Sequence, residues 1–276
     1  MTEKGYKVYG YRWVILIVFM LVNIAIQILW ISFASIGGEA ANFYGVTDLN
    51  IGFLSMIFMV VYVPLSIPVS WLIDKWGFKK AVGLGALIMS VFGLLRGIYA
   101  DEYSLVVITT IGIAVSQPFF LNAFTTVAAK WFSIDERAIA SGLATVAMFV
   151  GIAIGMVLTP ILILDYDIPT AQLSYGIVAI LTSLTFWIFT KEAPPTPPCP
   201  PEQEERALMM DGLKSMLKMK DIWYLMSVFL VGMGIFNGIS TWIESIARPK
   251  GFSITEAGEL GAFFLVGGVL GAIVLP

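Results

Sequence analysis

The chain has 276 residues, of which 58% are hydrophobic and 13% are charged; soluble domains average roughly 45–50% and about 25%. That composition excludes a water-soluble fold and predicts an integral membrane domain. A formal net charge of −3 argues against a nucleic-acid partner. Cys199 is the single cysteine, which argues against an intramolecular disulfide, and because histidine is also absent a structural zinc site is not expected. We predict no metal and no cofactor.

Apolar runs long enough to be membrane spans follow one another along the chain, since a helix needs about 20 mostly apolar residues to cross the bilayer. A final run begins near Leu260 and is still apolar at Pro276. The seven runs before it are Val14–Ile36, Ile51–Ile73, Ala81–Ala100, Ser104–Ala129, Ala138–Leu164, Leu173–Thr190 and Ile222–Ser245.

Lysine and arginine are distributed unevenly between the two sides of these spans. Thirteen of the sixteen lie in the N-terminal segment and in the loops on its side, two lie in the Arg248–Lys250 loop, and Arg96 lies inside a span. Because positive charge favours the cytoplasmic side of short loops, we expect a cytoplasmic N-terminus and an external Gly37–Asn50 loop.

A long hydrophilic stretch, 191–221, separates six spans from the rest. It opens with a proline-rich spacer, and Arg206–Lys220 then carries Leu or Met at 209, 213, 216 and 217, the spacing of an amphipathic helix. We therefore expect an N-terminal six-helix half at 1–190, a cytoplasmic linker at 191–221, and the first two helices of a second half at 222–276.

An internal repeat supports this division. An offset of 206 residues superimposes the second span on the last one and aligns Gly52 with Gly258, Leu54 with Leu260, Phe58 with Phe264 and Val60 with Val266. The expected fold is all-α, with two six-helix halves. In that register the chain ends within the eighth transmembrane helix, and about four spans of the second half would follow.

The short loop between the second and third spans carries a motif, Ser70-Trp-Leu-Ile-Asp-Lys-Trp-Gly-Phe-Lys-Lys80. A carboxylate at a helix end can face a neighbouring helix N-terminus, and a glycine permits the tight turn. The motif resembles the signature of the major facilitator superfamily, with serine in place of the first glycine. In that family the cluster latches the two halves together. The resemblance implies a conformational latch of Asp74, Lys75, Gly77, Lys79, Lys80, Glu136 and Arg137, the last two from a similar loop before the fifth span.

The fifth span also contains a small-residue face, Gly151-x-x-x-Gly155, which permits close helix packing. We expect Gly267 and Gly271 of the eighth span to be its partner.

A closer resemblance covers nearly the whole chain. Phe43-Tyr-Gly-Val-Thr47, Leu54-Ser-Met56 and Tyr62-Val-Pro-Leu65, continuing through Pro68 and Trp71 to Asp74, are similar to the feline leukaemia virus subgroup C receptor family. That family is implicated in haem, choline and ethanolamine transport. The resemblance implies a transporter.

Candidate substrate-binding residues are polar or aromatic groups within the spans, where a polar group tends to face a cavity. Asn23, Gln27 and Trp30 share one face of the first span, and Gln117 precedes a proline in the fourth. By the resemblance, Trp30 forms half of an aromatic cage for quaternary ammonium, Gln117 lines the same cavity, and Asn237, beside Phe236, replaces the second aromatic. The predicted site is Trp30, Gln117, Asn237, Asn23, Gln27 and Phe236, although each residue could serve helix packing instead.

Two ionisable residues in the spans have a simpler explanation. We expect Arg96 to extend towards Asp101, Glu102 or Asp165 at the membrane surface, and Glu244 to pair with Arg248 four residues later.

The leading functional prediction is a secondary transporter or facilitator of a small organic solute, an amine or a cofactor-like metabolite, that works by alternating access. A proton-coupled drug or metabolite antiporter of the same superfamily and a membrane receptor without transport remain open. An enzyme is not expected, because no nucleophile–base pair or metal cluster is visible. The expected partners are the small-molecule substrate and the lipid bilayer, for a monomer in the plasma membrane.

Overall fold

The computed structural model describes residues 6–199 and 217–274, with side chains described as far as residue 270. The expected amphipathic helix at Arg206–Lys220 lies largely outside these residues. Within them, all regular secondary structure is helical. The helices are α1 (Arg12–Ile31), η1 (Ala34–Ile36), α2 (Gly37–Tyr44), α3 (Asp48–Trp76), α4 (Phe78–Ile98), α5 (Tyr103–Leu121), α6 (Phe124–Trp131), η2 (Ile134–Glu136), α7 (Arg137–Asp165), α8 (Ile168–Phe189), α10 (Lys220–Ala247), η4 (Arg248–Lys250) and α11 (Ile254–Val274).

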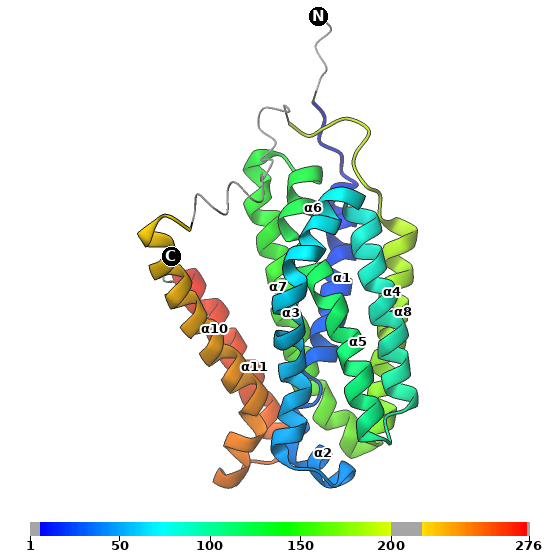
Figure 1. Cartoon of the computed structure of the whole chain (residues 1–276), viewed down its shortest axis with the longest axis vertical. Helices are drawn as coiled ribbons and strands as arrows, with labels where there is room; N and C mark the ends of the chain where they lie inside the picture. Colours follow the sequence, from blue (N-terminus) through cyan, green and yellow to red (C-terminus); the bar gives the residue numbers. More distant parts are fainter. Residues whose placement is uncertain (1–5, 200–216, 275–276) are drawn as a thin grey trace, which may run out of the picture.

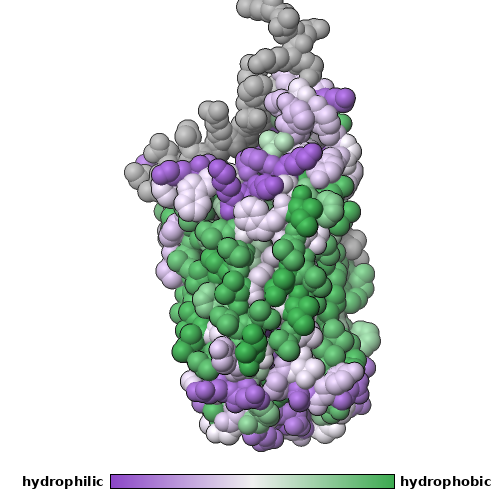
Figure 2. Space-filling model, turned by 90° about the vertical axis from the view of Figure 1, so that its right-hand side faces the viewer, coloured by the Kyte–Doolittle hydropathy of each residue, from purple (hydrophilic) through white to green (hydrophobic). Residues whose placement is uncertain are grey.

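Seven of the described helical segments are long and apolar enough to cross a membrane, and they coincide with the first seven predicted spans. The eighth predicted span is α11, which begins at Ile254, six residues earlier than expected. On the face shown in Figure 2, apolar side chains form a broad band across the middle of the molecule, and polar residues gather at both ends. This distribution is the one that a bilayer selects, and the chain is a multi-pass membrane protein.

The segments α1 to α8 form a bundle in which α1 is central, with thirteen buried residues (Figure 1). The described segment before α1, residues 6–11, lies at one end of this bundle, near the end of α8. Tyr11 donates its hydroxyl hydrogen to the carbonyl of Phe189 at 2.8 Å. We call this the N-terminal end, and the opposite end, where α2 lies, the α2 end.

Two local features differ from the expected elements. The predicted loop at Gly37–Asn50 contains the short helix α2, which ends at Gly45 in the left-handed conformation (φ +64°). The fourth span is divided into α5 and α6 after Pro118, where the Asn122 amide still reaches the Pro118 carbonyl at 3.1 Å. At the α2 end, Asp167 caps α8 by accepting a hydrogen bond from the Thr170 amide at 2.7 Å. Hydrogen bonding by the side chain and the amide of Thr170 lowers the pKa of the exposed Asp167 carboxyl.

Helices α10 and α11 lean away from the bundle (Figure 1). They approach it at the α2 end, where α10 contacts η1, α2 and α3 and α11 contacts α7. Towards the N-terminal end the two parts diverge. The interface between the bundle and the α10–α11 pair is therefore joined at one end and open at the other.

Candidate functional site

An aromatic pocket lies about halfway along the interface between the bundle and α10–α11. Phe236 of α10 stacks on Phe264 of α11 with ring centroids 5.8 Å apart, and it meets Phe149 of α7 edge-on at 6.1 Å. The pocket has a volume of about 420 Å³. Its lining residues are Phe149, Phe236, Phe263, Phe264, Leu265, Gly267 and Gly268.

The chemistry of this pocket is that of a hydrophobic site with aromatic faces. Such faces accept apolar groups, and their quadrupoles attract a cation that has lost part of its hydration shell. The pocket joins residues of the bundle to residues of both later helices. Any ligand held there would therefore respond to the separation of the two parts.

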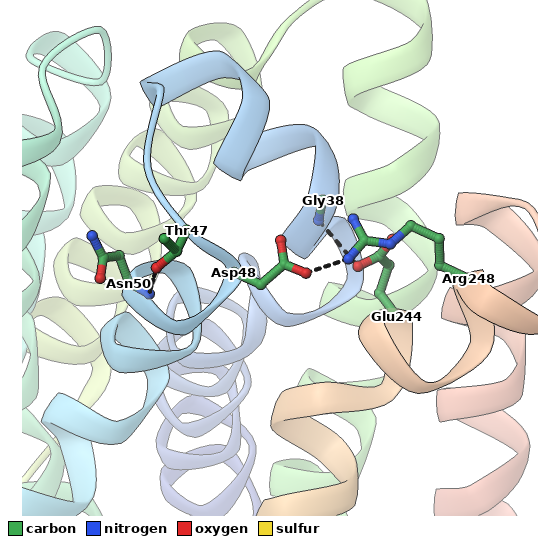
Figure 3. Close-up of polar contacts among 6 residues, drawn as sticks. All are labelled: Gly38, Thr47, Asp48, Asn50, Glu244 and Arg248. Atoms are coloured by element: carbon green, nitrogen blue, oxygen red, sulfur yellow. Dashed lines mark hydrogen bonds and ion pairs between the residues drawn. The ribbon is translucent and has the colours of Figure 1, made fainter.

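A polar contact closes the same interface at the α2 end (Figure 3). Glu244 of α10 is buried, and its Oε2 accepts a hydrogen bond from the backbone amide of Gly38 at 3.0 Å. Gly38 lies in the first turn of α2, where unpaired amides and the helix dipole favour a carboxylate. Glu244 is thus held by a helix terminus of the bundle.

Arg248 completes this contact, which we call the α2-end clamp (Gly38, Asp48, Glu244 and Arg248). Its guanidinium pairs with Asp48 at the start of α3, and its Nε lies 3.6 Å from Glu244 Oε1. The predicted pairing of Glu244 with Arg248 is confirmed. A side chain at Gly38 would collide with the Arg248 guanidinium, so the absence of a Cβ atom allows the close approach.

The predicted substrate residues do not gather at the aromatic pocket, with the exception of Phe236. Trp30 is 4% exposed, and its indole nitrogen donates to the Ser55 carbonyl of α3 at 3.1 Å. Asn23, Gln27 and Gln117 are likewise buried inside the bundle. Asn237 is partly exposed and bonds to the Met233 carbonyl of its own helix at 2.8 Å.

These buried amides keep unused hydrogen-bonding capacity. Asn23 Oδ1, Gln27 Nε2 and Gln117 Oε1 are buried and have no partner among the described residues. Buried polar atoms are normally paired. In this arrangement of the helices, no hydrogen bond within the described part joins any two of the six predicted residues.

The predicted latch residues lie at the N-terminal end of the bundle, at the α3–α4 junction and at the junction of η2 and α7. Gly77 adopts φ +85°, which lets α3 end at Trp76 and α4 begin at Phe78. Glu136 pairs with Arg12 at 2.8 Å, and Arg137 lies 3.1 Å from the Cys199 sulfur. Lys75 lies 4.6 Å from the Trp71 ring, and Asp74 is exposed, with Lys79 and Lys80 nearby in sequence.

Glu192, which the sequence reasoning missed, is the central anion at this end. It accepts hydrogen bonds from the Phe78 and Lys79 amides at 2.9 and 2.7 Å and pairs with Lys130. Glu192 therefore caps the N-terminus of α4. In the sequence, Glu192 is distinguished only by its place directly after the sixth span, and the α4 amides that it contacts are more than a hundred residues away.

Two expectations about the spans are wrong. Arg96 does not extend to the surface: it is 1% exposed, and it forms no ion pair within residues 6–199 and 217–274. The small face of α7 does not pack on α11, because Cβ atoms at Gly151 and Gly155 would meet Ile24, Ile28 and Ile31 of α1. Apolar α1 fills the centre of the bundle and is the nearer neighbour.

Comparisons with known proteins agree with this architecture. The family model described as Major Facilitator Superfamily matches residues 9–276. The chain is 31% identical over 283 residues to solute carrier family 49 member A3 of Danio rerio, an alignment that covers 98% of the chain and 59% of the relative. It is 28% identical over 286 residues to the choline/ethanolamine transporter FLVCR2 of Homo sapiens, covering 97% and 54%. The chain thus spans a little over half the length of these relatives, and the resemblance to the feline leukaemia virus subgroup C receptor family is confirmed.

Solved structures show the same fold. A bacterial homologue of the human lysosomal transporter Spinster, in an inward-facing and unoccupied conformation, superimposes with a TM-score of 0.80 at 17% identity, covering 97% of this chain and 62% of that one. The D-xylose-proton symporter superimposes with a TM-score of 0.63 at 13% identity, covering 93% and 66%.

Proposed function

The chain belongs to the major facilitator superfamily, and we propose that it carries a small organic solute across the plasma membrane by alternating access. The observation that supports this most directly is the one-sided interface. The α2-end clamp joins α10 to the bundle at one end, while the two parts diverge towards the other. A carrier that works by alternating access needs one arrangement that is closed at this end and open at the other, and a second arrangement with the open and closed ends exchanged.

We propose an amine or a cofactor-like metabolite as the substrate. Four phenylalanines from three helices line the mid-membrane pocket, and rings of this kind stabilise a cation with an apolar surface. Relatives named choline/ethanolamine transporters support the same class.

A proton-coupled exchanger is the second candidate, and one residue favours it. Glu244 is a carboxylate buried in the interface between the two parts. Protonation would weaken its hydrogen bond to the Gly38 amide and its attraction to Arg248. Proton binding could then be coupled to opening of the clamp.

A reversible cross-link across the clamp tests alternating access. A Cβ atom at Gly37 would lie 3.6 Å from Ser245 Oγ, so cysteines at the two positions can approach closely enough for a disulfide. In a background with Cys199 replaced by serine, Gly37→Cys with Ser245→Cys should lose uptake on oxidation and recover it on reduction. The two single variants are the controls. Undiminished uptake by the fully cross-linked protein would show that the α2 end need not open.

The proposed orientation places the N-terminal end in the cytoplasm. Cys199 is buried and therefore a poor reporter, so introduced cysteines at exposed Leu49 and Lys218 serve instead. In the same Cys199→Ser background, Leu49→Cys should react with a membrane-impermeant maleimide in intact cells, and Lys218→Cys only after permeabilisation. The reverse pattern would invert the orientation.

A further inference from the structure

Arg96 is a charged side chain enclosed within the bundle, near the α2 end of α4. Its Nη2 lies 3.3 Å from the hydroxyl oxygen of Ser32 at the end of α1, and its guanidinium carbon is 5.5 Å from the centre of the Phe33 ring. The side chains of Ser32 and Phe33 are 0% and 1% exposed. The guanidinium is therefore separated from solvent on the side of α1.

The positive charge of Arg96 has no negative partner among the described residues. None of the ion pairs found there includes it. The ring contact with Phe33 and the hydroxyl of Ser32 offer only partial compensation. Arginine does not lose its proton in proteins, so the charge cannot be removed by titration. A buried charge of this kind requires a counter-charge or a strong hydrogen-bonding partner.

Hydrogen-bond donors without acceptors surround the same point. Arg96 Nε is buried and unpaired within the described part, and so is Gln172 Nε2 of α8. Ser32 Oγ lies within reach of both side chains, 3.3 Å from Arg96 Nη2 and 3.4 Å from Gln172 Oε1. The two side chains that carry the unpaired donors therefore both contact one hydroxyl group, and together with the guanidinium charge these donors are suited to an anion.

The helices around this group leave little room. A Cβ atom at Gly97 would collide with the backbone of Leu173, and one at Gly176 would lie 2.7 Å from the Gly93 carbonyl oxygen, so α4 and α8 are in backbone contact on both sides of Arg96. A substrate carboxylate or a phosphate would need both a larger space and a route past these contacts. A single monatomic ion needs less space and a narrower route than either.

We propose that Arg96, Ser32 and Gln172 bind one small monovalent anion of the halide class, chloride under cellular conditions. The ion neutralises the guanidinium charge and accepts hydrogen bonds from Arg96 and Gln172. Water could pair with the same donors but would leave the charge uncompensated. The site is separate from the aromatic pocket and does not depend on the identity of the transported solute. Ser32 immediately precedes the Phe33–η1 segment that bears on α10, so the ion would support the bundle side of the α2-end clamp.

The first test is the anion dependence of thermal unfolding for the purified full-length protein in detergent. At constant ionic strength, replacement of gluconate by chloride or bromide should raise the Tm, and above the dissociation constant the Tm should rise by about 2–4 °C for each tenfold increase in halide concentration. Gluconate is too large to enter. The absence of any halide-specific change would overturn the proposal.

The second test supplies the counter-charge internally. Gln172→Glu places a carboxylate beside Arg96, so its Tm in gluconate should equal its Tm in chloride. Gln172→Leu introduces no counter-charge and should keep the halide response. Its half-saturating halide concentration should be about tenfold higher, as expected for the loss of one hydrogen bond to an ion. An Arg248→Gln control should respond as the wild type does. A full halide response in Gln172→Glu, or loss of the response in Arg248→Gln, would place the ion elsewhere. Should Gln172→Glu fail to fold, Ser32→Ala should raise the half-saturating concentration, and an unchanged value would overturn the site.

Discussion

The two ends of α10 have opposite surroundings. Residues near Ser240 to Ala247 are buried against η1, α2 and α3, whereas the segment from Trp223 to Ile235 exposes most of its apolar side chains, with Tyr224 and Leu230 each 73% exposed. The buried end contains the polar α2-end clamp, whereas the exposed end is mostly apolar.

The bundle shows a different kind of contact. Helices α4 and α8 pack along most of their lengths, and α1 is buried from Ile15 to Ile31 at most positions. Disruption inside the bundle should therefore destabilise the fold, because packing there is continuous. Disruption of the clamp should instead shift the balance between arrangements of two intact parts. The predictions below test that distinction, from the largest expected effect to the smallest.

Truncation of Trp30 should mainly reduce stability. The ring is buried between α1 and α3 and its N–H is bonded to the Ser55 carbonyl, so Trp30→Ala should destabilise the protein by about 3–5 kcal/mol. Trp30→Phe keeps most of the volume and should cost only about 1 kcal/mol for the lost hydrogen bond. Thermal unfolding and substrate affinity should be measured together. A loss of affinity with unchanged stability would instead favour Trp30 as the substrate contact that the sequence predicts.

Removal of the Glu244 carboxylate should open the α2 end. Glu244→Ala leaves the Gly38 amide without its acceptor, which should cost the closed arrangement about 1–3 kcal/mol. A cysteine at buried Ser240, introduced with Cys199→Ser, should then react faster with an impermeant maleimide from outside. Glu244→Gln retains a carbonyl acceptor and should increase the rate less. Equal rates in all three proteins would show that the clamp does not hold this end closed.

The sequence predicted the spans well because their signal is local. A run of about 20 apolar residues is sufficient to place a membrane helix, and Ala81–Ala100 differs from α4 by a few residues at either end. The pairing of Glu244 with Arg248 was predictable for the same reason, since the two are four residues apart and Arg248 directly follows the last turn of α10. The division into two homologous halves stays a prediction.

Long-range contacts were not predictable from local patterns. The hydrogen bond from the Gly38 amide to the Glu244 carboxylate joins residues 206 positions apart, and nothing near Gly38 in the sequence indicates which carboxylate it contacts. Arg96 was expected at the surface because it lies near a helix end, but its face of α4 is turned towards α1 and α8. The place of one residue in the sequence does not show towards which neighbouring helices its side of α4 is turned. The aromatic pocket likewise depends on Phe149, which has no distinguishing feature among many apolar residues of α7.

Replacement of the Phe236 ring by an aliphatic side chain should weaken substrate binding moderately. Phe236 contacts both Phe149 and Phe264 in the pocket, and an aromatic contact of this kind contributes about 0.5–1.5 kcal/mol. Phe236→Leu should thus lower the affinity for an amine substrate about two- to tenfold. Phe229→Leu, a change at a 65% exposed position of the same helix, is the matched control. Equal affinity in the two variants would place the substrate outside this pocket.

The pair formed by Asp48 and Arg248 should contribute least, although it is the most conspicuous contact in the clamp (Figure 3). Their side chains are 37% and 44% exposed, so water and salt screen the attraction, and such pairs typically contribute about 0–1 kcal/mol. A double-mutant cycle of Asp48→Asn and Arg248→Gln, read out by the labelling rate of the cysteine at position 240, should give a coupling within that range that decreases further at high salt. The buried Glu244 contact should exceed it, because an unpaired amide in the protein interior has no water to replace its partner. A coupling larger than the effect of Glu244→Ala would reverse this order and make the exposed pair the principal connection between the bundle and α10.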